Sequence, residues 1–341
     1  MTRHARFILL PLGILLTACL CGCLDRKERV IVNADGSAEI HLIVEGEDEA
    51  DIDQGDRLPR PGGQWQVERS TRPTPEGKPI HRLAAIAHVP AGVGLPSMFA
   101  EGSDSLKEAY LQFPTELKIE ERHDGWYYHF HRTYEPRQYA QVGFLEDAAG
   151  EQASSFAKKQ QSGEEIGLND FKGVSELLVK VAMGKIEIFA RQAFLDTNPN
   201  TPQDTWLSVH DALEELRRSA DYDRLAAILK NADQQDNSPV MEQLAREFDT
   251  ATMNTIVTTL ETSPYVRDTG GFRRRFEFHK TAYDITQDIG DDRFEVSVQM
   301  PGTIISHNAD SKVNNIVTWS FPGKMLYDRR IEMMVTSRVA R

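Results

Sequence analysis

Apolar and polar residues alternate in two stretches of the chain, one toward each end, and a stretch with helical spacing lies between them. Near the N-terminus, two runs of β-branched residues flank Asp35-Gly36. This dipeptide favours a tight hairpin turn, because glycine adopts the positive φ that the turn requires. The pattern predicts strands at about 28–34 and 37–46, and then an acidic loop over 45–63. Two more strand-like stretches follow at 65–68 and 81–89.

A second hairpin is predicted around Asp124-Gly125. Its returning strand, 126–134, alternates in two sets, as expected where one face of a sheet is packed and the other is polar. One set is Trp126, Tyr128, Phe130 and Arg132, and the other is Tyr127, His129, His131 and Thr133. Toward the C-terminus, alternating stretches around the turn Pro301-Gly302 predict further strands at 293–300, 303–306, 315–321 and 331–337.

Between these strands, apolar residues recur with the spacing of helices. Those at Val174, Val181, Ile188 and Leu195 are seven positions apart and predict a helix with one apolar face. Charged residues interrupt this run, so it does not predict a membrane span. Further helices are predicted to begin at Pro202 and at Ser238, where helix-capping patterns occur. The polar stretch 148–167 is expected to be a flexible connection.

The order of strands, helices and strands predicts an α+β fold, with a mostly antiparallel sheet built from both ends of the chain and a helical subdomain inserted between them. We expect a signal peptide at 1–18 and a lipidated tether at 19–28. The expected remaining parts are an N-terminal β-rich part at 29–136, a helical insertion at 137–263 and a C-terminal β-rich part at 264–341.

Composition indicates a globular protein with an acidic surface. The chain is 40% hydrophobic and 27% charged, and its 39 basic and 52 acidic residues give a net charge of −13. Removing Arg3 and Arg6 with the signal leaves 37 basic and 52 acidic residues, so the net charge of the mature part is 37 − 52 = −15. Such a surface repels nucleic acid and anionic headgroups, so we expect no nucleic-acid partner.

The first nineteen residues have the pattern of an export signal. Arg3, His4 and Arg6 form a basic head, the run 7–16 is apolar, and small residues follow it. This run is too short to span a bilayer, which needs about 20 apolar residues.

The tetrapeptide Leu16-Thr17-Ala18-Cys19 resembles the lipobox of bacterial lipoproteins. That resemblance implies cleavage before Cys19, a diacylglyceryl group on its thiol and anchoring by fatty chains such as palmitate. Cys23 is an alternative acylation site, because Leu20-Cys21-Gly22-Cys23 is a poorer version of the same box. Leucine at position 20, directly after Cys19, is similar to the residue pattern of lipoproteins that are passed on to an outer membrane. The alternative is a simple secretory signal cut nearby.

Cysteine usage agrees with an acylated N-terminus. Cys19, Cys21 and Cys23 are the only cysteines of the chain. The body therefore has no disulfide and no thiol nucleophile, and a lone C-x-C does not make a zinc site.

Two further regions resemble bacterial lipoproteins with an LppM-like domain. They are 30–37, which includes the first Asp-Gly turn, and the segments Met300–Asn308 and Asn315–Trp319. The resemblance implies an α+β domain in the cell envelope that binds lipid or glycolipid. The long helical middle departs from that family. Proteins of this type often end in a further membrane segment, whereas 327–341 is polar, so we expect the N-terminal lipid to be the anchor.

Arg273, Arg274 and Arg275 form the densest basic patch of this acidic chain. They follow Gly270-Gly271, and guanidinium groups grip phosphate or a lipid headgroup through charge-assisted hydrogen bonds. The alternative is a solvated run beside acidic neighbours. Trp126, Tyr127 and Tyr128 are candidates for lining a pocket, or for the core.

Histidines at two places are candidate metal ligands, but each has a simpler explanation. His129 and His131 face the same way on a strand, with His123 as a third candidate, but the polar face of a half-buried hairpin explains them better. His210 and Glu214 are four residues apart on a helix, which favours a surface hydrogen bond. We expect no metal and no cofactor.

The sequence contains no nucleophile elbow, phosphate loop, HExxH motif or dinucleotide fingerprint. We therefore expect no enzyme, but a lipid-anchored protein of the outer membrane or periplasmic face that binds a lipid, glycolipid or envelope partner. One alternative is an envelope hydrolase whose site is not recognisable from sequence. The other is a scaffold that docks a partner through the helical insertion.

Overall fold

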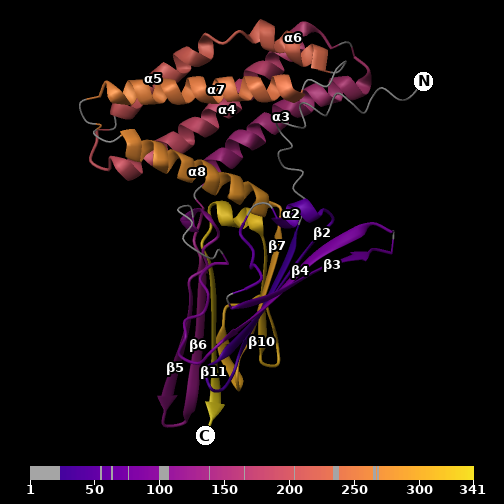
Figure 1. Cartoon of the computed structure of the whole chain (residues 1–341), viewed down its shortest axis with the longest axis vertical. Helices are drawn as coiled ribbons and strands as arrows, with labels where there is room; N and C mark the ends of the chain where they lie inside the picture. Colours follow the sequence, from indigo (N-terminus) through magenta and orange to yellow (C-terminus); the bar gives the residue numbers. More distant parts are fainter. Residues whose placement is uncertain are drawn as a thin grey trace. The chain divides into compact units, whose positions relative to one another are not determined.

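The computed structural model has the predicted α+β class, with two β-sheets and a set of long helices (Figure 1). It describes residues 24–341 apart from 54–55, 63, 76, 100–106, 138, 165, 203, 233–237, 264–265 and 267–268. The predicted signal peptide, Cys19 and Cys23 lie outside the described residues.

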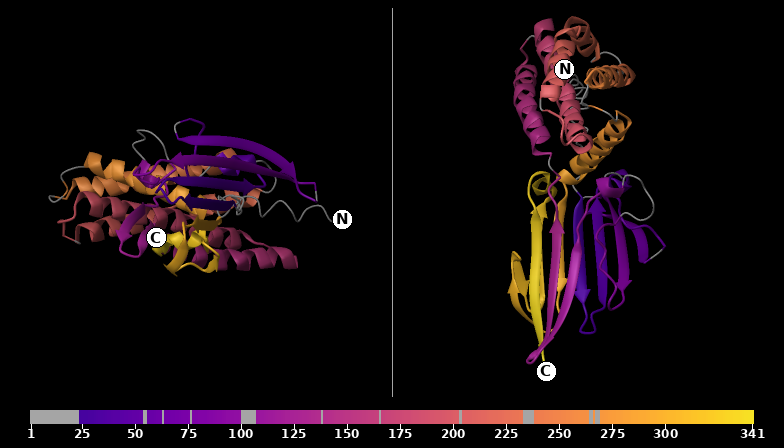
Figure 2. Two further views of the ribbon diagram at one scale, coloured as in Figure 1. Left: turned by 90° about the horizontal axis from the view of Figure 1, so that it is seen from below. Right: turned by 90° about the vertical axis from the view of Figure 1, so that its left-hand side faces the viewer.

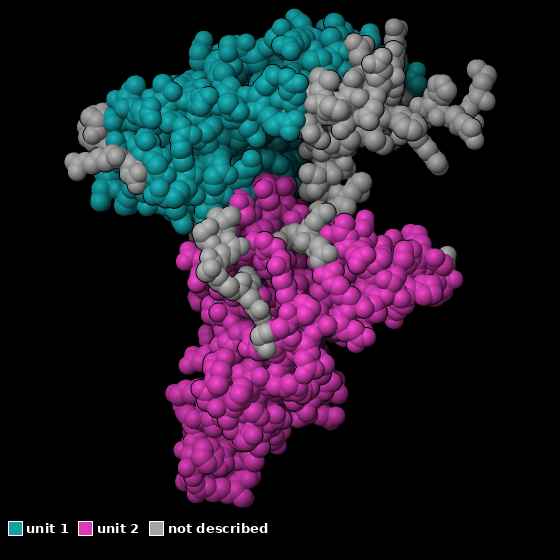
Figure 3. Space-filling model, in the orientation of Figure 1, with its two compact units in different colours: residues 1–20, 139–280 teal, residues 21–138, 281–341 magenta. Residues whose placement is uncertain are grey.

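The described chain divides into two compact units (Figure 3). The helical unit consists of residues 139–280, and the β unit consists of 24–137 together with 281–341. No described helix is both long enough and apolar enough to cross a membrane.

The β unit contains two sheets. The seven-stranded sheet has the order β3-β4-β2-β1-β7-β10-β9, and the four-stranded sheet has the order β5-β6-β11-β8. The strands are β1 (Asp25–Val32), β2 (Ala38–Gly46), β3 (Trp65–Pro73), β4 (Pro79–Val89), β5 (Thr115–Arg122), β6 (Gly125–Tyr134), β7 (Arg293–Gln299), β8 (Thr303–His307), β9 (Ser311–Val313), β10 (Ile316–Pro322) and β11 (Ile331–Ala340). Short helices at Glu49–Asp53 (α2), Lys107–Ala109 and Gly323–Tyr327 complete this unit.

Strand β1 joins the two ends of the chain in one sheet. It pairs antiparallel with β2 and parallel with β7, so that Asp25 is opposite both Glu45 and Arg293. In the four-stranded sheet, β11 pairs with β6 along its whole length. Strands from both ends of the chain therefore share a sheet, as the sequence predicted, but they form two such sheets where the sequence predicted one.

The predicted hairpin turns are present at both Asp-Gly pairs. Gly125 has a φ of +145°, and a Cβ atom there would lie 2.2 Å from the carbonyl oxygen of Val339. Glycine is therefore required by both the backbone conformation and the close approach of the neighbouring strand.

Figure 2 shows the strands of the two sheets from two further directions. Inward-facing side chains of both sheets form one apolar core. Val30 and Val32 of β1 contribute from the larger sheet, and Tyr128 and Phe130 of β6 contribute from the smaller sheet. The two sets predicted for residues 126–134 are correct for most of this strand, but Trp126 is 40% exposed near the hairpin turn and Thr133 is buried near the other end of the strand.

The tether predicted for residues 19–28 ends too late in the sequence, because its last residues belong to a strand. β1 begins at Asp25, and alternate residues of its first half, Arg26 and Glu28, are buried. A charged sequence of this kind resembles a solvated linker. It becomes a strand here because buried partners of opposite charge lie on β6 and after the helices.

The helical unit contains α3 (Ala140–Ser162), α4 (Leu168–Thr197), α5 (Asp204–Arg218), α6 (Tyr222–Ala232), α7 (Ser238–Glu261) and most of α8 (Thr269–Gly290). Within this unit, α4 packs against α3, α5, α6 and α7. The helix starts predicted near Pro202 and at Ser238 are correct, because α5 begins at Asp204 and α7 at Ser238.

Three predictions about the helices need correction. Most of 148–167 is helix α3, and α8 occupies the start of the part that was expected to be β-rich. In α4 the seven-residue period is present and Val174 is buried as predicted, but the buried column further along contains Val179, Ile186 and Ala193, whereas Leu195 is exposed. A shift of two residues turns a side chain by about 200° around a helix with 3.6 residues per turn.

An ion pair buried between the two sheets joins β1 to β6. Arg132 Nη1 lies 2.7 Å from Glu28 Oε2, and Arg132 Nε donates to Thr115 Oγ1. The Arg132 guanidinium also lies 4.8 Å from the ring centre of Phe113. Glu28 Oε1 and Arg132 Nη2 have no hydrogen-bond partner, so the pair is only partly satisfied.

Removing one partner of this pair is expected to destabilise the β unit. Glu28→Ala leaves a buried, uncompensated guanidinium, and we expect the free energy of unfolding to fall by about 3–5 kcal/mol. The measurement is urea unfolding followed by circular dichroism. Glu120→Ala, which removes a carboxylate from the exposed face of β5, is the control and should leave the midpoint almost unchanged. Equal effects of the two substitutions would contradict a structural role for the buried pair.

Candidate functional site

The three arginines of the predicted anion-binding patch, Arg273, Arg274 and Arg275, lie near the start of α8. One of them is ion-paired and the other two are exposed. Arg275 donates from Nε and Nη2 to Asp196 Oδ2 of α4, at 2.9 and 2.6 Å, and its guanidinium lies 4.3 Å from the ring centre of Phe278. Arg273 and Arg274 are exposed, and neither forms an ion pair with a described residue. The candidate anion-binding patch is therefore an arginine pair.

Asp196 also accepts a hydrogen bond from His279 Nε2, at 2.9 Å. Burial acts to raise the pKa of Asp196, but the hydrogen bonds from Arg275 and His279 outweigh it and hold this pKa below its ordinary value. Burial lowers the pKa of His279, although the hydrogen bond to Asp196 opposes this shift. His279 is therefore neutral at pH 7. The cluster joins the end of α4 to α8.

A carboxylate and an imidazole are also paired in a catalytic triad, but there the carboxylate contacts Nδ1 of the histidine, whereas Asp196 contacts Nε2 of His279. No hydroxyl group of the described residues is hydrogen-bonded to the His279 ring. Sequence reasoning missed the cluster because Asp196 and His279 are 83 positions apart. Asp196 lies in a predicted helix, whereas His279 lies in the part that was predicted to be β-rich, so the sequence carries no signal for this contact.

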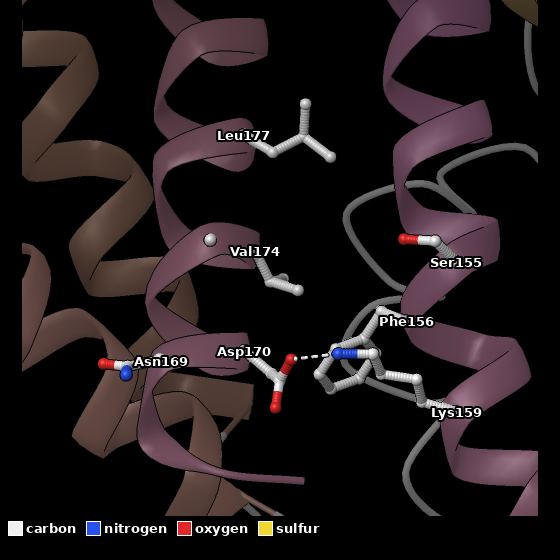
Figure 4. Close-up of a pocket in the computed structure, with 8 residues that line it drawn as sticks. Ser155, Phe156, Lys159, Asn169, Asp170, Val174 and Leu177 are labelled. Atoms are coloured by element: carbon white, nitrogen blue, oxygen red, sulfur yellow. Dashed lines mark hydrogen bonds and ion pairs between the residues drawn. The ribbon is translucent and has the colours of Figure 1, made fainter.

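A pocket opens between α3 and α4 of the helical unit (Figure 4). Phe156, Val174 and Leu177 form an apolar side, and Lys159 Nζ contacts Asp170 Oδ1 at 2.8 Å across the opening. The hydrogen bond from Lys159 holds the pKa of Asp170 below its ordinary value, so both groups are ionised at pH 7. A pocket with an apolar wall and an ion pair at its opening suits an amphipathic ligand.

The histidines of β6 behave as a polar face. His129 Nδ1 is 3.1 Å from Thr336 Oγ1, His131 Nε2 is 3.3 Å from Thr133 Oγ1, and His123 is almost fully exposed. No group of three metal-binding side chains was found among the described residues. The contacts of His129 and His131 with threonine hydroxyl groups fit the polar-face interpretation of the sequence.

The predicted contact between His210 and Glu214 is not the one formed. His210 Nδ1 lies 2.8 Å from Glu187 Oε1 of α4, and Glu214 binds Arg217. The hydrogen bond from His210 to Glu187 raises the pKa of this histidine. The pair therefore joins α5 to α4 instead of bridging one turn of α5.

The aromatic residues after Gly125 do not line one pocket. Tyr128 is buried, and its hydroxyl donates to the carbonyl oxygen of Ala34 at 2.5 Å. Tyr127 faces the other side of the sheet, where its hydroxyl donates to Asp124 and Arg122 lies over its ring. Tyr127 and Tyr128 therefore support the two hairpins near their turns, and Trp126 is 40% exposed.

The β unit holds a second set of buried charges around Arg26. Arg26 Nε lies 2.6 Å from Asp292 Oδ2, and Arg26 Nη1 lies 3.6 Å from Asp56 Oδ2. The remaining carboxylate oxygens accept backbone N–H groups, Asp292 Oδ1 from Leu24 and Asp56 Oδ1 from Leu111. Asp56 Oδ2 has no hydrogen-bond partner, because 3.6 Å is too long for one.

Two buried carboxylates thus share one close guanidinium. Burial raises the pKa of both Asp56 and Asp292, while the charge of Arg26 opposes the shift for each. The charge of Arg137 also acts to lower the pKa of Asp56, and that of Asp56 acts to raise the pKa of Asp292. The sequence contained no signal for this cluster, since its members come from three distant segments.

Comparisons with known proteins identify no family. No protein-family model matches the chain, and no curated protein matches it. The folded domain of LppM from Mycobacterium tuberculosis, a solved structure, aligns over 94% of this chain and 92% of its own, with 9% identity and a TM-score of 0.30. A TM-score this low carries no argument about fold or function. The resemblance to LppM-like lipoproteins stays a prediction from the sequence motifs.

The shared guanidinium leads to a prediction about pH. Because the pKa of Asp56 in the folded chain lies above its ordinary value of 3.8, this group contributes stability that is fully present below about pH 3.8 and is lost as pH rises through the folded pKa. Asp56→Asn keeps the acceptor for Leu111 and removes the charge. We expect the stability of this variant, relative to the parent chain, to increase from pH 4 toward pH 8.

Urea unfolding at several pH values measures this difference. The control is Asp35→Asn, at an exposed turn where hydrogen bonds from Ser37 lower the pKa of the carboxyl. Its effect should be complete by about pH 4 and constant above that. A difference between the parent chain and Asp56→Asn that does not change with pH would show that Asp56 is ionised in the folded chain throughout.

Proposed function

We propose that this chain is a lipid-anchored, non-catalytic protein of the bacterial cell envelope that binds a lipid or glycolipid carrying an anionic group. The N-terminal sequence supports the anchor, because a basic head, a short apolar run and Leu16-Thr17-Ala18-Cys19 occur in the order expected of a lipoprotein signal. A thioether-linked diacylglyceryl group supplies two fatty chains, and two chains hold a protein to a bilayer stably where one does not.

The arginine pair supports an anionic ligand. In a chain with a net charge of −13, Arg273 and Arg274 are neighbouring guanidinium groups that no described carboxylate neutralises. Guanidinium groups bind phosphate through paired, charge-assisted hydrogen bonds. The adjacent Arg275 is held by Asp196, which makes it a residue that supports the fold of the helical unit.

The pocket between α3 and α4 belongs to the same helical unit and offers a second type of contact. Its apolar side, formed by Phe156, Val174 and Leu177, suits a hydrocarbon or the face of a sugar ring. An amphipathic ligand is the chemical class that uses both an apolar wall and charged groups.

The anchor is tested by metabolic labelling with a fatty acid. We expect Cys19→Ala to abolish the label and to release the chain from membranes, because it removes the thiol that the lipobox directs to acylation. Cys23→Ala is the matched control and should keep the label. Label that survives in Cys19→Ala but is lost in Cys23→Ala would move the acylation site, and an unlabelled parent chain would refute the anchor.

The ligand is tested with residues 20–341 and vesicles that contain phosphatidylglycerol. We expect Arg273→Ala combined with Arg274→Ala to reduce binding at least several-fold without changing the unfolding midpoint, because both side chains are exposed and neither is paired with a carboxylate in the described part of the chain. Arg275→Ala is the control and should lower the thermal midpoint, because it leaves Asp196 with fewer donors.

Mass spectrometry of lipids retained by the same purified protein identifies the ligand class. Absence of retained lipid, together with vesicle binding that is insensitive to the arginine pair, would refute lipid recognition and favour the scaffold alternative.

A further inference from the structure

We propose that the β unit stands on the membrane by one end. This end, called the anchor end, holds Leu24, Asp292 and the short helix Gly323–Tyr327, and we infer that it faces the lipid surface. The opposite end, called the tip, holds the hairpin turn at 123–125 and Ala340, and it points away from the bilayer. The inference rests on the proposed acylation of Cys19.

The first step is that Leu24 is held in the β unit by hydrogen bonds of its backbone. The backbone N–H of Leu24 donates to Asp292 Oδ1 at 3.1 Å, and its carbonyl oxygen accepts from the N–H of Arg293 at 2.9 Å. The Leu24 side chain is buried in the core of the β unit. Leu24 therefore marks a rigid point from which the preceding residues lead to the lipid.

The second step is the reach of those residues. A fully extended chain spans at most about 3.6 Å per residue, so the five steps from Cys19 to Leu24 cover at most about 18 Å. If Cys23 carries the lipid, the reach is about 4 Å. Either attachment keeps the anchor end close to the headgroups.

The third step is the length of the β unit. Tyr134, the last residue of β6, lies with its ring 5.7 Å from that of Phe321 near the anchor end, whereas Gly125 at the start of the same strand is opposite Ala340 at the tip (Figure 1). Ten residues of antiparallel strand extend over about 30 Å. The tip is thus farther from Leu24 than the tether is long.

The fourth step is that the outer face of the four-stranded sheet does not favour lying flat on a membrane. Along β5 this face carries charged side chains, among them Glu116, Lys118, Glu120 and Arg122. Hydrogen bonds from Lys118 and Arg122 lower the pKa of Glu120 to about 2, so it is ionised. Along β5 this face offers little apolar area to insert, although Ile305 of β8 and Met334 of β11 in the same sheet are exposed, and the net charge of −13 repels anionic headgroups.

The junctions of the helical insertion lie at the same end of the β unit. The backbone N–H of Arg137 donates to the carbonyl oxygen of Leu326 in the short helix, and its side chain donates to Thr286 and Ala282 of α8. Both crossings into residues 139–280 are therefore close, within the β unit, to the point where the lipid tether arrives.

Fluorescence energy transfer tests the orientation, and the cysteine-free body of the chain allows clean labelling. In an acylated chain with Cys21→Ser and Cys23→Ser, a donor dye is placed at the anchor end by Arg329→Cys or at the tip by His123→Cys. Both positions are exposed, His123 almost fully. The vesicles contain phosphatidylethanolamine and phosphatidylglycerol, with an acceptor dye on a headgroup.

We expect several-fold greater transfer from position 329 than from position 123. Lys107→Cys and Glu121→Cys form a second anchor-end and tip pair, should one variant not fold. Equal transfer from the two ends, or greater transfer from the tip, overturns the orientation while leaving the anchor intact. A chain that does not float with vesicles overturns the anchor, and the orientation with it.

Discussion

The contact on which the β unit depends is the buried ion pair between Arg26 and Asp292, together with the hydrogen bond from Leu24 to the same carboxylate. It joins residues 266 positions apart, with the whole helical insertion between them in the sequence. It also places β1 beside β7 at the centre of the larger sheet. Without β1, strands β3-β4-β2 and β7-β10-β9 would have no hydrogen-bonded connection, so this contact sets the register in which the two ends of the chain meet.

Charges of this kind are costly inside a protein, and their partners explain why they are tolerated. Removing a carboxylate or guanidinium from water costs several kcal/mol, which only close partners and further hydrogen bonds offset. Arg26 and Arg132 each have a carboxylate at hydrogen-bond distance. Asp56 Oδ2 and Glu28 Oε1, in contrast, accept no hydrogen bond from a described residue. The β unit therefore has a polar region in its interior near the anchor end. The stability of that region depends on the protonation of its carboxylates, whereas the other end of β1, with Val30 and Val32, contributes apolar side chains that do not titrate.

Local sequence patterns predicted the hairpins, the alternation of β6 and the starts of α5 and α7, because each depends on a few neighbouring residues. The turn at Gly125 needs only glycine and an aspartate before it. The patterns failed where partners are distant in the sequence. Arg26 and Glu28 were assigned to a tether because their counter-charges lie on other strands, and the buried column of α4 was displaced because any of several apolar columns fits the same period.

The sequence by itself determined the α+β class, the pairing of strands from both ends of the chain, and the expectation of an acylated N-terminus. These depend on residue order over short spans, which hydrophobic spacing and glycine turns express directly. Only the tertiary structure decided that Arg275 belongs to Asp196 while Arg273 and Arg274 stay exposed, and that Leu24 is held by Asp292. Neighbouring arginines have the same side chain, so the sequence does not distinguish them. The position of the Asp196 carboxylate on another helix decides which arginine is ion-paired.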